Sequence, residues 1–230
     1  PNKLWDAWRQ KNKLKAAKTA VDNSNWVSVG PNSSSNTYSS ATLKSSGQGR
    51  VNAIAVDPNN SNTYYVGAPA GGIWKSTDAG INWQPLTDNL PQIGVSGIAI
   101  SPSDSNTIYI ATGDDDANDS PSIGVMKSID GGATWNTTGA MTGGVPNSMN
   151  EIYIDPNNNN TVLVATSNGV FKTVDGGTNW VQKLAANILD LKMKPGDATT
   201  WYAVSATKFY RSTDSGETFA EVAIPALTAG

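Results

Sequence analysis

Short apolar runs separated by polar turn segments dominate the hydrophobic pattern of this chain. The runs are rich in Val, Ile and Tyr and are too short to form helices. Apolar runs of this kind, bounded by turn residues, are typical of β-strands that are buried on both faces. The pattern therefore predicts an all-β fold. The runs come in pairs, which lie at 51–56 and 63–67, 98–100 and 107–111, 152–154 and 161–165, and 188–193 and 200–204.

The segment that joins the two runs of a pair is rich in Pro, Asn and Asp, as in 57–62. Pro fixes one backbone angle of a turn, and Asn and Asp side chains bond to their own backbone. A third apolar run follows each pair, and after another turn the chain enters a fourth predicted strand. Four antiparallel strands per repeat make one blade of a β-propeller, which is the predicted fold. The third runs lie at 72–75, 124–127, 169–172 and 208–211.

A short motif, Ser/Thr-x-Asp-x-Gly-x-x-aromatic, follows every third run and forms the turn before the fourth strand. Its aspartates recur at intervals of 39 to 52 residues, and a repeat of this length is typical of propeller blades. We call each copy an aspartate box. The boxes comprise Ser76, Asp78, Gly80 and Trp83; Ser128, Asp130, Gly132 and Trp135; Thr173, Asp175, Gly177 and Trp180; and Ser212, Asp214, Gly216 and Phe219.

The residue types of the box favour a structural role over a functional one. The carboxylate and the hydroxyl form hydrogen bonds across a tight turn, and the glycine supplies a backbone angle that other residues resist. The aromatic ring is expected to pack between the strands of its own blade. The boxes are therefore predicted to form four similar hairpins at the outer rim, away from the central channel.

The propeller domain is predicted to span 25–230. Its first segment, 25–31, resembles the fourth strand of a blade but has no first three strands of its own. This orphan strand predicts an incomplete ring, in a protein that continues beyond Gly230. The alternative is a compact four-bladed ring with an irregular entry strand. The four blades are expected at about 47–90, 91–140, 145–185 and 186–225.

The segment 1–24 combines Trp5, Trp8 and Leu14 with many lysines and predicts a short, basic, amphipathic helix. One interpretation is a docking segment or a membrane-surface anchor. The other is a helix packed on the propeller edge or a solvated lead-in. The second is favoured because the apolar face is short.

Composition narrows the possible functions. The net charge is −3 and charged residues make up 15% of the chain. This composition lacks the excess of basic residues that nucleic-acid binding requires. The chain has no cysteine and no histidine, so thiolate chemistry and the commonest general base are excluded. No apolar run is long enough for a membrane span. If the protein is exported, its signal peptide has already been removed.

The boxes and their strands, over about 25–225, resemble the aspartate-box (BNR) propeller repeats of sialidases, sortilin-type receptors and xyloglucanase-type glycoside hydrolases. Three segments look like the sortilin-like (VPS10-type) propellers of large proteins that gliding bacteria export by type IX secretion: 26–31 (WVSVGP), 49–54 (GRVNAI) and 67–76 (GAPAGGIWKS). The resemblance implies a secreted or cell-surface module with a role in adhesion or gliding. It also implies protein partners in the secretion or surface-attachment machinery, and possible glycan ligands.

The residues disfavour catalysis. Sialidases use three arginines, and this chain has only Arg9, Arg50 and Arg211, of which Arg50 alone is expected to face the channel. The xyloglucanase-type enzymes carry an aspartate before the Gly-Gly of the first blade, where this chain has Ala-Pro-Ala at 68–70. Glu151 is expected at the channel mouth, but a glycosidase needs two facing carboxyls. We therefore expect a non-catalytic binding module. The alternatives are a glycan-processing domain with its remaining catalytic residues outside this chain, and a structural spacer in an adhesin.

An acidic loop at 113–122 is the one polar segment that enlarges a repeat. Its carboxylates repel one another unless water or a cation neutralises them. Asp114, Asp116 and Asp119 have a short spacing that suits Ca²⁺, which takes about six to eight oxygen ligands. The loop lacks the glycine and the terminal glutamate of an EF-hand. A solvated acidic loop is the favoured interpretation, and a calcium site is the alternative; no other cofactor is expected.

Overall fold

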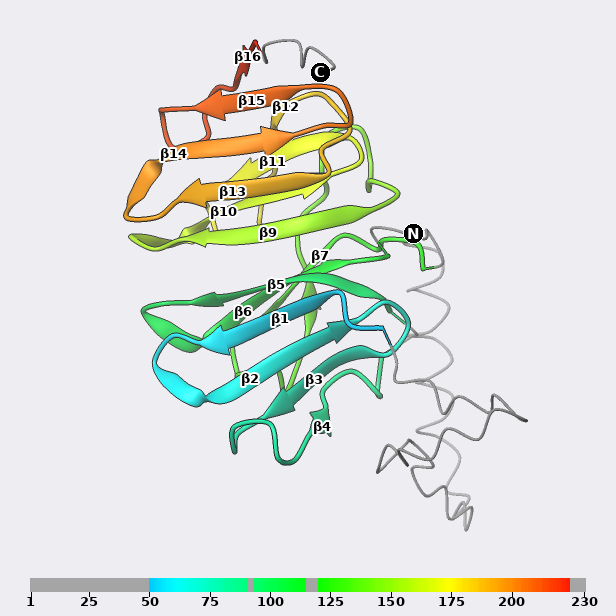
Figure 1. Cartoon of the computed structure of the whole chain (residues 1–230). Helices are drawn as coiled ribbons and strands as arrows, with labels where there is room; N and C mark the ends of the chain where they lie inside the picture. The colour runs from blue at the N-terminus through cyan, green and yellow to red at the C-terminus, as the bar shows by residue number, and fades with distance from the viewer. Residues whose placement is uncertain (1–49, 91–92, 115–119, 224–230) are drawn as a thin grey trace, which may run out of the picture. The chain divides into compact units, whose positions relative to one another are not determined.

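The computed structural model describes residues 50–90, 93–114 and 120–223 (Figure 1). The chain separates into two compact units, Val51–Gly230 and Asn2–Arg50. The predicted basic lead-in at 1–24 and the orphan strand at 25–31 lie outside the described residues. The fold described below is that of the first unit.

Sixteen strands among the described residues form four antiparallel sheets of four strands each, and the same residues contain no helix. The prediction of four four-stranded blades is confirmed, and we number the blades 1 to 4. Blade 1 holds β1 (Ala53–Asp57), β2 (Asn60–Ala68), β3 (Gly72–Ser76) and β4 (Gln84–Pro85); blade 2 holds β5 (Val95–Ser101), β6 (Asp104–Thr112), β7 (Val125–Ser128) and β8 (Asn136–Thr137); blade 3 holds β9 (Met149–Asp155), β10 (Asn158–Thr166), β11 (Gly169–Thr173) and β12 (Val181–Leu184); and blade 4 holds β13 (Asp190–Lys194), β14 (Asp197–Val204), β15 (Phe209–Ser212) and β16 (Ala220–Val222).

Within each blade the strands pair in sequence order, from the inner first strand to the outer fourth strand. The inner strands β1, β5, β9 and β13 form a row in which each packs on the inner strand of the next blade. Blade 1 (cyan) and blade 4 (orange) lie at the two ends of this row in Figure 1. This arrangement is that of consecutive propeller blades.

Side chains alternate between the two faces of a blade, and both faces of blade 3 are packed. In β10, Val162 and Val164 belong to a core cluster shared with blade 2, whereas Leu163 and Ala165 belong to a cluster shared with blade 4. All four are at most 1% exposed, which explains the continuous apolar runs. We call the face toward the preceding blade the trailing face and the face toward the following blade the leading face.

A lysine of the third strand closes each joint between blades. Its ammonium donates a hydrogen bond to a backbone carbonyl in the aspartate box of the following blade. The carbonyl next to the box glycine is the acceptor in all three joints. The pairs are Lys75 with Gly131 at 3.2 Å, Lys127 with Gly176 at 3.2 Å, and Lys172 with Ser215 at 2.9 Å.

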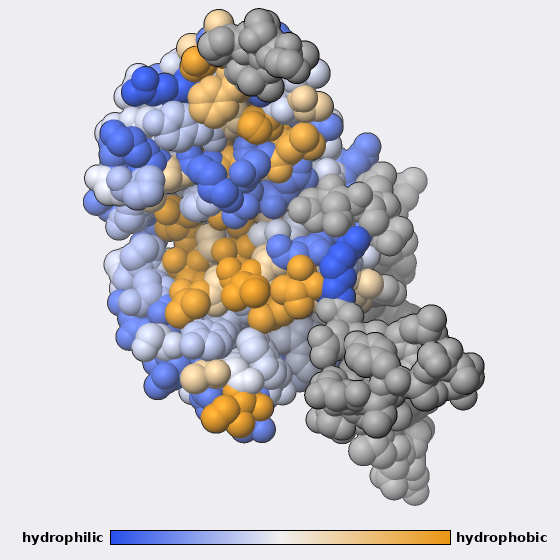
Figure 2. Space-filling view, viewed as in Figure 1, coloured by the Kyte–Doolittle hydropathy of each residue, from blue (hydrophilic) through white to orange (hydrophobic). Residues whose placement is uncertain are grey.

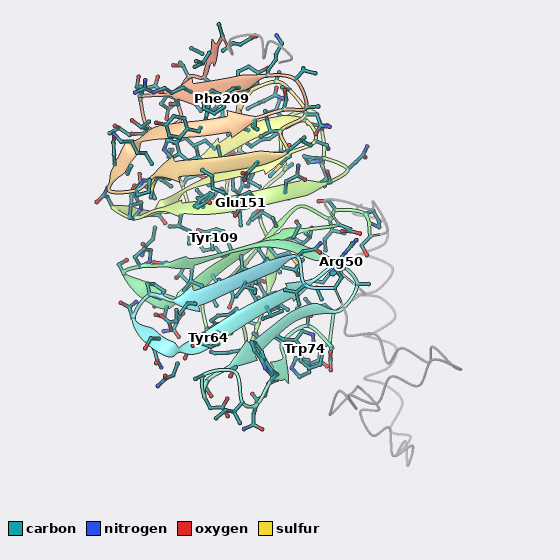
Figure 3. The ribbon with its side chains drawn as sticks, viewed as in Figure 1. Arg50, Tyr64, Trp74, Tyr109, Glu151 and Phe209 are labelled. Atoms are coloured by element: carbon teal, nitrogen blue, oxygen red, sulfur yellow. The ribbon has the colours of Figure 1, made fainter. Side chains whose placement is uncertain are left out.

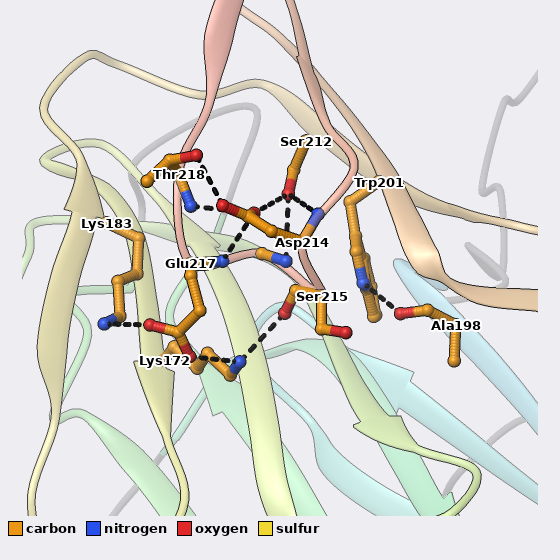
Figure 4. A network of polar contacts seen from close by, with 10 residues as sticks. Lys172, Lys183, Ala198, Trp201, Ser212, Asp214, Ser215, Glu217 and Thr218 are labelled. Atoms are coloured by element: carbon orange, nitrogen blue, oxygen red, sulfur yellow. Dashed lines mark hydrogen bonds and ion pairs between the residues drawn. The ribbon is translucent and has the colours of Figure 1, made fainter.

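The joint between blades 3 and 4 also holds an ion pair (Figure 4). Lys172 is only 5% exposed, and burying an ammonium is costly unless it is paired. Its partner is Glu217, with 2.6 Å between Nζ and Oε1, and Lys183 contacts the other oxygen of the same carboxylate at 2.6 Å. Hydrogen bonds from Lys172 and then Lys183 lower the pKa of Glu217.

Each box contains two consecutive residues with positive φ, and they turn the box carbonyl toward the preceding blade. Blades 2 and 3 have glycine at the first of these positions, whereas blades 1 and 4 have Ala79 (φ 59°) and Ser215 (φ 62°). A side chain in this conformation is strained by about 1–2 kcal/mol. Two of the four boxes therefore store backbone strain that the other two avoid.

Replacing Ala79 by glycine should stabilise the protein. The strain energy removed from the folded protein exceeds the free-energy cost of the extra conformational entropy that glycine gives the unfolded chain. The free energy of unfolding is therefore expected to rise by about 0.5–1 kcal/mol. Thermal or urea unfolding measures it. Ala206→Gly is the matched control, because Ala206 is exposed and has no positive φ, and it should be neutral or destabilising. If both substitutions changed the free energy of unfolding equally, the backbone strain at Ala79 would be contradicted.

Candidate functional site

The aspartate boxes share one hydrogen-bond pattern, which box 2 illustrates. Ser128 Oγ donates to Asp130 Oδ1 at 2.8 Å and accepts the Gly132 N–H at 2.9 Å. The N–H and hydroxyl of Thr134 donate to the two carboxylate oxygens of Asp130 at 2.8 and 2.5 Å. Box 4 repeats the pattern in Figure 4, and Asn82 and Asn179 take the place of the threonine in boxes 1 and 3. The network holds the turn in a single conformation.

Each box loop is anchored to the start of the second strand of its own blade, at the third residue of that strand. In blade 2 the Gly131 N–H donates to the Asn106 carbonyl at 3.0 Å, and the equivalent bond recurs in the other three blades: Ala79 to Asn62, Gly176 to Asn160 and Ser215 to Thr199. The boxes therefore lie at the end of the blade opposite to the starts of the inner strands. This placement leaves the inner-strand starts as the candidate functional region.

One box aromatic, Trp180, packs differently from the expectation that each ring fills its own blade. Trp180 is buried, and its indole N–H donates to Thr138 of the preceding blade at 3.2 Å. Trp135 is also buried, next to Gly132. Trp83 belongs to blade 1, which follows no other described blade, and it is 37% exposed. Trp180 thus contributes to the joint between blades 2 and 3, whereas Trp83 donates its indole N–H to the Gly80 carbonyl of its own box at 3.0 Å.

A charged cluster lies at the starts of β9 and β13. Lys192 contacts two carboxylates, Glu151 Oε2 at 2.9 Å and Asp190 Oδ1 at 3.0 Å, and its ammonium stands 5.6 Å from the ring centre of Tyr153. We call these four residues the mouth cluster. Burial alone would lower the pKa of Lys192, but its hydrogen bonds to Glu151 and Asp190 outweigh burial and raise it. Burial, followed by the charge of Glu151, raises the pKa of Tyr153.

Glu151 is thus on an inner strand, as the sequence predicts, and it has a partner that the sequence did not reveal (Figure 3). Lys192 and Asp190 lie in the least regular repeat, where polar and apolar residues alternate along β13. That alternation was the sequence signal that could have identified Lys192 and Asp190 as partners of Glu151, because polar residues in an inner strand must face a channel or a joint. Arg50 is exposed and lies three residues before β1. Its predicted channel-facing position stays a prediction.

The acidic loop is described only at its ends. Asp114 is fully buried, accepts a hydrogen bond from Asn52 Nδ2 at 3.1 Å, and donates its own N–H to the Ser120 carbonyl at 3.0 Å. Asp116 and Asp119 lie outside the described residues. Among the residues that are described, no group of three acidic side chains could hold a metal ion. The calcium site therefore stays a prediction, and Asp114 links the base of the loop to the segment that enters β1.

Comparison with known proteins identifies the fold. No protein-family model matches the chain, and no curated protein matches it. The chain is similar in structure to an ancestral GH74 enzyme (TM-score 0.60, 26% identity, 75% of this chain and 25% of that chain). It is also similar to the GH74 xyloglucanase of Xanthomonas campestris, with a TM-score of 0.61 and 19% identity over 76% of this chain and 30% of that chain. A third neighbour is YCF48 bound to D1 peptide, with a TM-score of 0.56 and 17% identity over 77% of this chain and 55% of that chain.

These neighbours are β-propeller proteins, and the chain is therefore a set of β-propeller blades. It spans less than a third of the length of the GH74 enzymes and about half the length of YCF48. None of the described residues forms a helix that is long and apolar enough to cross a membrane.

The boxes should make the protein sensitive to acid. The side-chain and backbone hydrogen bonds of Thr134 lower the pKa of Asp130 to about 2, and those of Asn179 lower the pKa of Asp175 to about 2, from 3.8. A pKa that folding depresses contributes stability above pH 3.8, and this contribution is lost as the pH falls toward 2. The melting temperature should therefore drop between pH 4 and pH 2.

Asp130→Asn tests this cause, because the asparagine keeps one oxygen acceptor but has no charge to lose. The variant should be less stable at pH 7 and should lose less stability than the wild type between pH 4 and pH 2. Asp88→Asn is the control, because Asp88 is exposed and contacts no box. It should keep the wild-type profile. A wild-type profile in Asp130→Asn would show that the box carboxylate does not cause the acid sensitivity.

Proposed function

We propose that this chain is a non-catalytic β-propeller interaction module of a secreted or cell-surface protein. The observation that carries the proposal is the mouth cluster, where one ammonium binds both carboxylates. A glycosidase needs one carboxyl that is protonated and another that is ionised, facing each other across the substrate. Glu151 and Asp190 instead face the same Lys192, within 3.0 Å of its nitrogen. This arrangement suits recognition better than proton transfer.

The mouth cluster offers a partner both signs of charge and an aromatic ring. The side chains of Lys192 and Asp190 are about half exposed and that of Glu151 is one third exposed. Exposed charged groups steer association and select partners by complementarity. A protein surface with paired charges fits this cluster better than an apolar ligand. We place the partner in the type IX secretion or surface-attachment machinery on the sequence resemblance alone.

Glycan processing is the second candidate, favoured by one observation. The structural neighbours include GH74 enzymes, one of them at 26% identity. The chain covers 25% of that enzyme, so catalytic groups of a related enzyme could stand outside the compared region. In this alternative Glu151 supplies one carboxyl, and a further blade supplies its counterpart.

Hydrolysis assays separate the two candidates. The chain should show no turnover of xyloglucan, other β-glucans or sialosides above the level of its Glu151→Gln variant, because that substitution removes the charge of the only glutamate at the mouth. Hydrolysis by the wild type that disappears in Glu151→Gln would overturn the non-catalytic assignment. Thermal melting of both proteins verifies that the variant is folded.

A binding assay tests the recognition role directly. Labelled chain should bind saturably to outer-membrane vesicles of a gliding bacterium, and Lys192→Glu should weaken that binding about tenfold or more, since three carboxylates would then repel one another. Lys194→Glu is the matched control on the same strand, because Lys194 pairs with Asp197 and not with the mouth cluster. Binding that is absent, or equally weakened by both variants, counts against the proposal.

A further inference from the structure

A polar pocket of about 310 Å³ lies in the joint between blades 2 and 3, beside the outer strand β8. Blade 2 lines it with Lys127, Ile129 and residues 136–139, and blade 3 lines it with residues 176–178 of its box. Lys127 is the only charged residue of this lining. The pocket, which we call the rim pocket, therefore presents an ammonium, an amide and several hydroxyl groups to a ligand, but no carboxylate.

The joint between blades 3 and 4 shows which group binds a lysine at this position. Lys172 is the equivalent of Lys127, since each is the second-last residue of a third strand and each reaches the box of the following blade. The carboxylate of Glu217 binds Lys172 at 2.6 Å, and Lys183 binds the other oxygen of the same carboxylate at 2.6 Å (Figure 4). In this joint the lysine has a carboxylate partner, which a second donor holds in place.

The joint between blades 2 and 3 has a threonine where Glu217 stands in the next joint. Thr178 is the third residue after Asp175, as Glu217 is after Asp214, and its hydroxyl donates to the Asp175 carbonyl at 3.1 Å. Lys127 is partly buried and donates to a box carbonyl, but it has no ion pair within the described part of the chain. A carboxylate would stabilise this ammonium, because charge-assisted hydrogen bonds are about twice as strong as neutral ones.

Asn136 provides a second donor in the rim pocket. It is the register partner of Lys127 across β7 and β8, so both side chains lie on the leading face of blade 2. Asn136 is exposed, and its side-chain amide forms no hydrogen bond to any described residue. Its N–H groups can therefore donate to a carboxylate that Lys127 holds, as Lys183 donates to Glu217.

The negative charge of box 3 does not exclude a carboxylate from the rim pocket. In blade 4 the N–H of Glu217 donates to the Asp214 carboxylate at 3.1 Å, so that glutamate lies next to a box carboxylate. Asp175 and Asp214 are held by equivalent hydrogen bonds from their own boxes. Since a bound carboxylate is stable beside box 4, the same arrangement is available beside box 3.

We propose that the rim pocket binds an acidic side chain, glutamate or aspartate, of a protein partner. One carboxylate oxygen accepts from Lys127 and the other accepts from the Asn136 amide. Ile129 is 66% exposed at the edge of the pocket and contacts the residues that flank the acidic one. None of the lining residues is aromatic, so a sugar ring finds no surface for stacking, whereas an acidic side chain already occupies the equivalent place in the next joint.

The rim pocket is separate from the mouth cluster. The cluster lies on the inner strands β9 and β13, and hydrophilic side chains gather over β13 in Figure 2. The pocket lies beside the outer strand β8. The identity of the ligand as a protein rests on the proposed interaction function, but the carboxylate site does not. Lys192→Glu should leave the rim pocket unchanged, so failure of one site is distinguishable from failure of the other.

An NMR titration of the full chain tests the site with a blocked tripeptide, acetyl-Ala-Glu-Ala-amide. The tripeptide should shift the amide signals of Gly139 and Thr178 saturably, and its glutamine counterpart should bind at least about tenfold more weakly, because it lacks the charge. Lys127→Met should weaken binding of the glutamate tripeptide by at least about tenfold. Lys194→Met is the matched control, because Lys194 lies on β13 and pairs with Asp197, and it should bind like the wild type.

Thr178→Glu keeps Lys127 and tests the same geometry if Lys127→Met does not fold. The new glutamate stands at the position of Glu217, so it should pair with Lys127 and compete with the tripeptide. Thr178→Gln is the control of equal size without charge. The glutamate variant should melt at a higher temperature than the glutamine variant and should bind the tripeptide more weakly than it. Equal melting temperatures and equal binding in the two variants would contradict the site.

Three outcomes of the titration overturn the proposal. The first is a wild type whose signals do not shift at any tripeptide concentration, or shift equally with the glutamine tripeptide. The second is binding that survives in Lys127→Met and is lost in Lys192→Glu, which would place the carboxylate at the mouth cluster. The third concerns the source of the carboxylate: glucuronate that binds more tightly than the glutamate tripeptide would assign the pocket to an acidic sugar.

Discussion

The row of blades depends on one recurring contact, in which a lysine of one blade donates to a carbonyl in the aspartate box of the next. The hydroxyl and carboxylate of the box fix its turn, as Ser128 and Asp130 do in blade 2. Two residues with positive φ then aim the carbonyl backward at the lysine. Because a buried ammonium such as Lys172 needs an acceptor, a displaced box would leave the joint both unpaired and poorly packed.

The same constraint explains the asymmetry between the ends of the row and its middle. A blade buries its large side chains only where a neighbour covers them, since each blade is a single sheet. Leu163 is buried in a closed joint, and burial of such a side chain contributes about 1.5–3 kcal/mol. Ile54 and Trp83 lie on the trailing side of blade 1 and remain exposed. Stability is thus a property of the joints more than of the blades.

Local signals made most of the fold predictable from the sequence. Apolar runs marked the strands, and the boxes marked the turns with fixed hydrogen-bond roles, so blade number and strand order followed. The partner of Glu151 could not be predicted, because Lys192 comes from a different blade about forty residues later and its repeat is irregular. The packing of Trp180 on the preceding blade was missed for the same reason. Contacts within one blade are local, and contacts between blades are not.

The sequence by itself determined the repeat, the strands within each repeat and the chemistry of every box. These features depend on neighbouring residues and on alternation along one strand. Only the tertiary structure decided which faces are covered and that Lys192 joins Glu151 to Asp190. The reason is physical: whether an apolar or charged side chain is satisfied depends on what packs against it, and that neighbour lies on another blade.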